Sequence, residues 1–175
     1  SSSTASAGGS DTEYKIGITQ IVSHASLDAA REGFKDGLAD AGLKVSYDEQ
    51  NAQADQATAS SIASKFASAD LDLVLAIATP TAQATAQVIS DVPIVFTAVT
   101  DPVAADLVAS NEAPGANVTG TTDMNPVAEQ IDLVKQVAPD AKTVGIIYSS
   151  GEINSAVQVD LARQAAAAQG LEVVE

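Results

Sequence analysis

The sequence predicts an α/β fold, in which helices cover both faces of a doubly wound parallel sheet, followed by an incomplete second α/β unit. From residue 14 onward, short apolar runs rich in branched residues alternate with segments of helical periodicity. Strands that follow one another through helices pair in parallel by right-handed crossovers. The run at 71–78 is almost wholly apolar, as expected for a strand covered on both faces.

The first unit is expected to contain four strands, at residues 14–22, 43–50, 71–78 and 93–99. Apolar residues at helical spacing predict a first helix over 27–41, with Ser26 as its cap and Gly42 as its stop. A second helix should start near Asp55. A third should open with Thr79 as cap and Pro80 at the first helical position.

The second unit begins after a segment rich in Pro, Gly and Asn, residues 112–126, which lacks a long apolar run. Strands are expected at 142–150 and 171–175. Two apolar stripes predict helices: Val127, Ile131, Val134 and Ala138, then Ile153, Val157, Leu161 and Ala165. Two or three strands bury little of a doubly wound sheet, so we expect a fragment of a longer protein. The alternative is one continuous sheet of six or seven strands.

The composition narrows the class of ligand. Eight basic and 23 acidic side chains give a formal net charge of −15, which repels nucleic acid and also serves solubility. The absence of cysteine excludes disulfides and thiolate metal sites. No run reaches the roughly 18 apolar residues of a membrane span.

Residues 1–13 are small, polar and aperiodic, which predicts a flexible tether. They are similar to the stretch that follows the lipidated cysteine of Gram-positive lipoproteins, and an ordinary disordered terminus is the alternative. No export signal precedes them, so we expect any such signal to have been removed.

Polar residues follow the expected strands repeatedly, where ligands gather in open α/β sheets. The candidate caps are Thr79, Thr100, Asp101, Asn125, Ser150 and Asn154. Their hydroxyls and the free helix amides suit a carboxylate, although each residue can equally serve as a plain cap. Asp101 and Asp123 could receive a ligand ammonium or stand as solvated turn residues.

Catalytic and metal-binding patterns are missing from the sequence. It contains no G-x-S-x-G elbow, no phosphate-binding loop and no dinucleotide fingerprint. The single histidine, His24, has no partner at metal-ligand spacing. We therefore expect no catalysis, no metal and no cofactor.

Several segments carry a family resemblance that keeps its order from residue 14 to 175. They are "QIVSHASLDAAREGFKDGLADAG", "NAQADQATASSIASKF", "DLVLAIATPTAQA", "PIVFTAVTDPVAADLV", "PGANVTG" and "VGIIYSSGEINSAVQV". Together they resemble the ABC transporter substrate-binding family that includes the tryptophan/tyrosine-type binding proteins. Family members are longer than this chain.

The resemblance implies two lobes of the type I periplasmic-binding kind that close on ligand by a hinge. Residues 14–120 would form lobe one with the hinge at its end, and 121–175 the start of lobe two. The implied ligand-facing positions are Gln20, His24, Thr79, Pro80, Thr97, Thr100, Asp101, Asp123, Ser149, Ser150, Asn154 and Ser155. The implied ligand is an aromatic amino acid and the partner an ABC permease.

The implied location is the extracellular face of the cytoplasmic membrane, through a lipid anchor absent from this chain, or the periplasm. Two other functions stay open. A ligand-sensing regulatory domain of the repressor type shares this kind of lobe, but the acidic chain and the Ser/Gly-rich leader disfavour a DNA-binding head. An α/β enzyme is the remaining alternative.

Overall fold

The computed structural model describes residues 12–175, which begin with a five-stranded parallel sheet. Its strand order is β2-β1-β3-β4-β5, and all four neighbouring pairs are parallel. The strands are β1 Glu13–Gln20, β2 Lys44–Asn51, β3 Leu73–Ile77, β4 Ile94–Val99 and β5 Val118–Thr122. This arrangement confirms the predicted parallel sheet.

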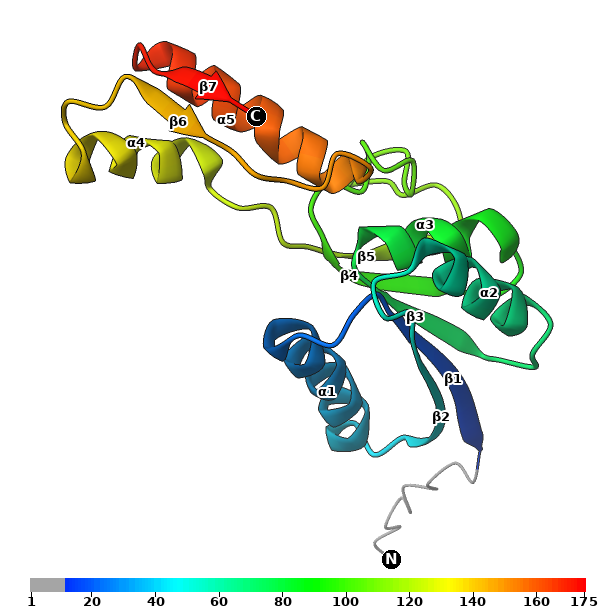
Figure 1. The fold of residues 1–175 in the computed structure, drawn as a ribbon. Helices are drawn as coiled ribbons and strands as arrows, with labels where there is room; N and C mark the ends of the chain where they lie inside the picture. Colours follow the sequence, from blue (N-terminus) through cyan, green and yellow to red (C-terminus); the bar gives the residue numbers. More distant parts are fainter. Residues whose placement is uncertain (1–11) are drawn as a thin grey trace, which may run out of the picture.

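Helices cover both faces of this sheet, as predicted (Figure 1). Helix α1, Ala25–Asp40, lies on one face, whereas α2, Gln56–Ala67, and α3, Thr79–Val88, lie on the other. The alternation of side chains along β3 follows from this layering. Leu75 and Ile77 join the apolar cluster under α1, and Val74 joins the cluster under α2 and α3.

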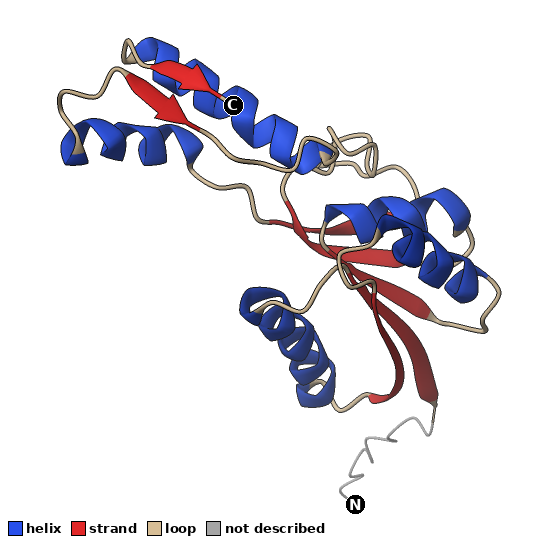
Figure 2. Cartoon of the chain, in the orientation of Figure 1, coloured by secondary structure: helices blue, strands red, loops and turns tan. Residues whose placement is uncertain are grey.

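The remaining elements form a second, smaller unit (Figure 2). Its helices are α4, Val127–Val137, and α5, Ile153–Ala168, and its strands are β6, Thr143–Gly145, and β7, Glu172–Val174. The two strands pair in parallel as a separate sheet. The alternative of one continuous sheet is therefore wrong. The fully buried core of this unit consists of Val127, Ile131, Ala162, Ala166 and Leu171.

Strand β5 was not predicted, because residues 112–126 show no apolar run. It lies at the edge of the sheet, and of its five residues only Val118 is buried. Polar threonines therefore suit the exposed remainder. The expected strand at 142–150 is also too long. Pairing with the short β7 ends at the bond from the Ile146 amide to the Val174 carbonyl, 2.8 Å long.

The buried face of α5 differs from the expected stripe. Val159, Ala162 and Ala166 are buried, while Ile153 is 38% exposed. Apolar residues of α5, many of them alanine, occupy most sides of the helix, so their spacing did not identify a single buried face. The stripe predicted for α4 is confirmed at Val127 and Ile131.

The helix starts agree with the sequence in part. Helix α2 starts next to Asp55 as predicted, and the Asp55 side chain caps it, with Oδ1 accepting from the Thr58 amide at 2.6 Å. Helix α1 is capped by His24 rather than Ser26, since His24 Nδ1 accepts from the Ser26 amide at 3.3 Å. Thr79 is the first residue of α3, and Ala78 occupies its cap position.

The tether predicted at residues 1–13 lies outside the described residues except at its end, where Glu13 begins β1. Across residues 12–175, no helix has the length and apolar character needed to span a membrane.

Gly120 is required where β5 meets β4. It pairs with Phe96, and a Cβ at this position would overlap the Phe96 carbonyl oxygen and lie 2.6 Å from Cδ2 of the ring. We expect Gly120→Ala to lower the free energy of unfolding by about 1–3 kcal/mol, the usual cost of overpacking. Urea denaturation measures this loss.

Gly33→Ala is the matched control, since a Cβ on this exposed residue of α1 meets nothing within 4 Å. Helix propensity predicts a gain of up to about 1 kcal/mol there. Equal stability of the Gly120→Ala and wild-type proteins would contradict the tight β4–β5 contact.

Candidate functional site

A cavity of about 460 Å³ lies at the carboxyl ends of the strands, between the two units. The connection after β1 leads to β2 on one side of the sheet, and the connection after β3 leads to β4 on the other side. The cavity therefore lies at the topological switch point, where α/β proteins bind ligands. The first unit contributes Ile21, Val22, Ala54, Gln56, Ala78, Thr79, Pro80 and Ala98, and the second contributes Ser149, Gly151, Glu152 and Asn154.

Strained backbone concentrates around this cavity. Ala54, Ala78 and Ala98 have φ angles of 62°, 84° and 55°, and all three line the cavity. Residues 12–175 contain only two other non-glycine residues with positive φ, Gln53 and Asp106. Such conformations cost about 1–3 kcal/mol each and cluster at functional sites. Backbone strain therefore marks this cavity independently of its shape.

The wall from the first unit offers a few hydrogen-bond donors at the start of a helix, to which Pro80 contributes no amide. Helix α3 begins at the cavity with Thr79, and no side chain caps it. The first amides of a helix lack partners within the helix and carry partial positive charge. Thr79 is 2% exposed, and its hydroxyl oxygen is buried without a hydrogen-bond partner. This wall suits an anionic group such as a carboxylate.

The facing wall from the second unit offers acceptors. The Nδ2 of Asn154 donates to Glu152 Oε2 at 3.2 Å, while Oδ1 of Asn154 is buried without a partner. Glu152 itself lines the cavity. An ammonium or another N–H group could pair with this carboxylate and amide oxygen. Helix α5 also begins at this wall, at Ile153 and without a side-chain cap, so both walls offer free helix amides together with an unpaired side-chain oxygen.

A buried network supports the loop after β1. Gln20 is 1% exposed, and its Nε2 donates to the Val22 carbonyl at 2.8 Å and to Asp28 Oδ1 at 2.7 Å. Its Oε1 accepts from Arg31 at 3.2 Å. Hydrogen bonds from Gln20 and then Ser23 hold the pKa of Asp28 below its ordinary value. Gln20 therefore uses both ends of its amide to fix Val22 in the cavity wall.

The cavity brings together four of the positions predicted from the sequence: Thr79, Pro80, Ser149 and Asn154. The other predicted positions do not line it. Ser150 lies beside Ser149 in the chain, and Ser155 instead lines a groove between α4 and α5. His24 caps α1, as described above, and Gln20 is engaged in the network just described.

The positions predicted in and after β4 are largely committed to local structure. Thr97 accepts a hydrogen bond from the Thr121 hydroxyl at 3.1 Å. The carboxylate of Asp101 accepts from the amides of Val103 and Ala104, which gives it the role of a turn cap. Thr100 is 7% exposed and contacts Gln158, and the Asp123 amide donates to the Val99 carbonyl.

Some cavity residues were missed by the sequence reasoning. Ala54 and Gln56 follow β2, and the rule that ligands gather at carboxyl strand ends would have found them. Ala78, Ala98 and Gly151 carry no polar side chain, so only their backbone conformation and position assign them to the wall.

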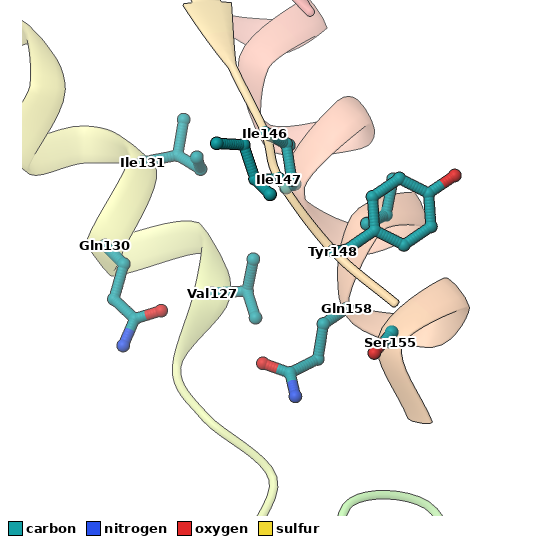
Figure 3. A pocket seen from close by; sticks show the side chains of 10 residues that line it. Val127, Gln130, Ile131, Ile146, Ile147, Tyr148, Ser155 and Gln158 are labelled. Carbon is teal, nitrogen blue, oxygen red and sulfur yellow. The ribbon is translucent and has the colours of Figure 1, made fainter. Parts of the chain in front are cut away.

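A second hollow, of about 320 Å³, lies within the second unit (Figure 3). Helices α4 and α5 flank it, together with Ile146, Ile147 and Tyr148 of the segment after β6. Its lining is mostly apolar. The Tyr148 hydroxyl donates to Glu175 at 2.7 Å, which raises the pKa of Tyr148. This groove lacks the unpaired buried oxygens of the first cavity.

Phe96 of β4 does not line the cavity between the units and is buried in the sheet core at 3% exposure. Among residues 12–175, no three His, Asp or Glu side chains group as metal ligands.

Comparison with known proteins identifies the family. The model of the family described as ABC transporter substrate binding protein matches residues 15–175. A tyrosine-binding protein of Clostridioides difficile (strain R20291) is 48% identical over 170 residues, which cover 95% of this chain and 49% of that protein. The chain therefore spans about half the length of this curated relative.

Two solved structures show how the fold is shared. The ABC domain of Streptococcus pneumonia in complex with L-Trp superposes with a TM-score of 0.89 at 42% identity, covering 93% of this chain and 56% of that one. The ligand-free, open structure of a substrate-binding protein with adhesive properties from Clostridium difficile superposes with a TM-score of 0.72 at 51% identity, with the same coverage. The more similar sequence thus superposes less well.

These matches confirm the type I periplasmic-binding fold that the resemblance implied. They also remove the enzyme alternative, because substrate-binding proteins are not enzymes. The chain belongs to the ABC transporter substrate-binding protein family.

Proposed function

We propose that this chain is the amino-terminal part of an extracytoplasmic binding protein that delivers an aromatic amino acid to an ABC importer. The observation that carries the proposal is the cavity between the units, to which each unit contributes a buried oxygen without a hydrogen-bond partner, Thr79 Oγ1 from one and Asn154 Oδ1 from the other. A ligand that contacts both walls binds their closed arrangement better than an open one. Only such a difference in affinity can shift an open–closed equilibrium.

The two units are then the two lobes. We assign residues 14–120 to lobe one, with the hinge at its end, and residues 121–175 to the start of lobe two. The separate sheets support a division into two lobes, but β5 runs to Thr122 in the first sheet, so the boundary that agrees with the sheets lies after Thr122. Residues 1–13 would tether the protein to the membrane as in a lipoprotein, and a permease would receive the ligand from the closed form.

The ligand is a zwitterion in this proposal. Its carboxylate binds the start of α3 and the Thr79 hydroxyl, and its ammonium faces Glu152 and Asn154. Pro80 and Ser149 complete the contacts. An aromatic side chain is supported by the relatives, one named for tyrosine and one bound to L-Trp. We propose no direct ligand contact for the eight predicted positions outside the cavity.

The first test is a thermal-shift screen on the longest natural protein that contains this sequence. We expect L-Tyr, L-Trp or L-Phe at 100 times its Kd to stabilise the protein by about 2.7 kcal/mol through mass action, and sugars or nucleotides to leave the melting temperature unchanged. A melting temperature that no amino acid raises would sink the ligand assignment.

The second test removes the Thr79 hydroxyl. Thr79→Val should weaken binding of the amino acid about tenfold or more, because a hydrogen bond to a charged group contributes about 1.5–3 kcal/mol. Thr79→Ser keeps the hydroxyl and should bind nearly as well as wild type. Isothermal titration calorimetry measures both affinities.

Thr97→Val is the matched control, since the Thr97 hydroxyl meets Thr121 and does not line the cavity. We expect its affinity to match wild type. Equal affinities of the Thr79→Val and wild-type proteins would show that the carboxylate binds elsewhere.

A further inference from the structure

One side chain of the second unit contacts the first unit at the end of β4. Gln158 of α5 points its Nε2 at the Thr100 hydroxyl oxygen, 3.5 Å away. Thr100 is buried at 7% exposure and directly follows the last residue of β4. The turn after Thr100 is fixed by the carboxylate of Asp101, as described above. Gln158 therefore meets a rigid partner on the opposite unit.

The other end of the Gln158 amide is held by its own unit. Its Oε1 accepts from Asn125 Nδ2 at 3.1 Å. Asn125 lies in the segment that connects β5 to α4, two residues before the helix, and its carbonyl accepts from the Val127 amide at 2.8 Å. Figure 3 shows Gln158 extending from α5 on the side of Val127, where α4 begins. The bond to Asn125 orients the amide so that its donor end faces Thr100.

A motion of one unit relative to the other would affect the two hydrogen bonds of Gln158 differently. The Asn125–Gln158 bond joins α5 to the segment directly before α4. The Gln158–Thr100 bond crosses between the units and must break when they part. The chain also superposes with a higher TM-score on the L-Trp complex than on the ligand-free, open structure, at equal coverage of this chain.

We propose that Gln158 is a positioning residue that favours the arrangement of the two units described here without contacting the ligand. It lies outside the cavity between the units and lines the separate groove of Figure 3. Its effect on affinity rests on the proposed function, whereas its effect on the arrangement of the units does not. The two effects are measured separately.

The arrangement is measured by the distance between two spin labels. Residues 1–175 contain no cysteine, so Ala67→Cys on α2 and Gln136→Cys on α4, both exposed, provide the attachment sites once any cysteine outside these residues is replaced by serine. In the longest natural protein that contains this sequence, Gln158→Leu and Thr100→Val should each shift the ligand-free distance distribution to longer values. Thr100→Ser keeps the hydroxyl and should resemble wild type. Gln164→Leu, at an exposed position of the same helix, is the control.

The affinity readout uses L-Tyr and stopped-flow kinetics. Gln158→Leu and Thr100→Val should each raise the dissociation rate of L-Tyr about fivefold, the equivalent of one net hydrogen bond. The double variant should release L-Tyr no faster than either single variant, because both substitutions remove the same bond. Without ligand, the Gln158→Leu and Thr100→Val variants should melt at the same temperature as the Gln164→Leu control. This result would separate an effect on the arrangement of the units from an effect on folding.

Unchanged distance distributions in both variants would overturn the proposal, whatever the kinetics show. Wild-type protein that binds no aromatic amino acid would instead refute the proposed function, and the distance measurement would then decide the role of Gln158 alone. Additive effects of the two substitutions would show that Gln158 and Thr100 act independently, against the bond proposed here.

Discussion

The structure depends on burying strand β3 on both of its faces. Val74, Leu75, Ala76 and Ile77 are at most 1% exposed, so helices must cover the sheet from two sides. Parallel strands joined by right-handed crossovers satisfy this requirement. As a consequence, the carboxyl ends of the strands and the starts of the helices meet at one edge. The burial of β3 thus requires helices on both faces of the sheet, and this layering brings strand ends and helix starts together where the cavity lies.

The same edge carries structure that folding alone does not favour. Three alanines adopt positive φ there, and two polar side-chain atoms remain buried without partners. Alanine is the smallest residue that keeps a Cβ, so these turns leave space that a larger side chain would fill. An unpaired buried polar atom costs about 1–3 kcal/mol. A ligand that supplied the missing partners would recover this cost, which links the strain of the free protein to binding.

The elements with a clear pattern of buried residues were the ones that the sequence predicted well. The apolar run of β3 and the start of α2 near Asp55 were predicted correctly, because two-sided burial and helical spacing of apolar residues leave local signals. Strand β5 was not predicted, because four of its five residues are exposed. The buried face of α5 was not identified, because alanine occurs on several sides of this helix. The separate pairing of β6 with β7 was expected only as one of two alternatives.

The sequence by itself determined the layered α/β class, the family and the edge of the sheet at which polar residues gather. Only the tertiary structure decided which of those residues face the cavity: Thr79 and Asn154 do, while Thr97, Thr100 and Asp101 bond to other parts of the protein. The physical reason is that a hydroxyl or carboxylate can cap a turn, pair across strands or meet a ligand with equal chemistry. The direction of its side chain is set by the packing of elements far apart in the chain.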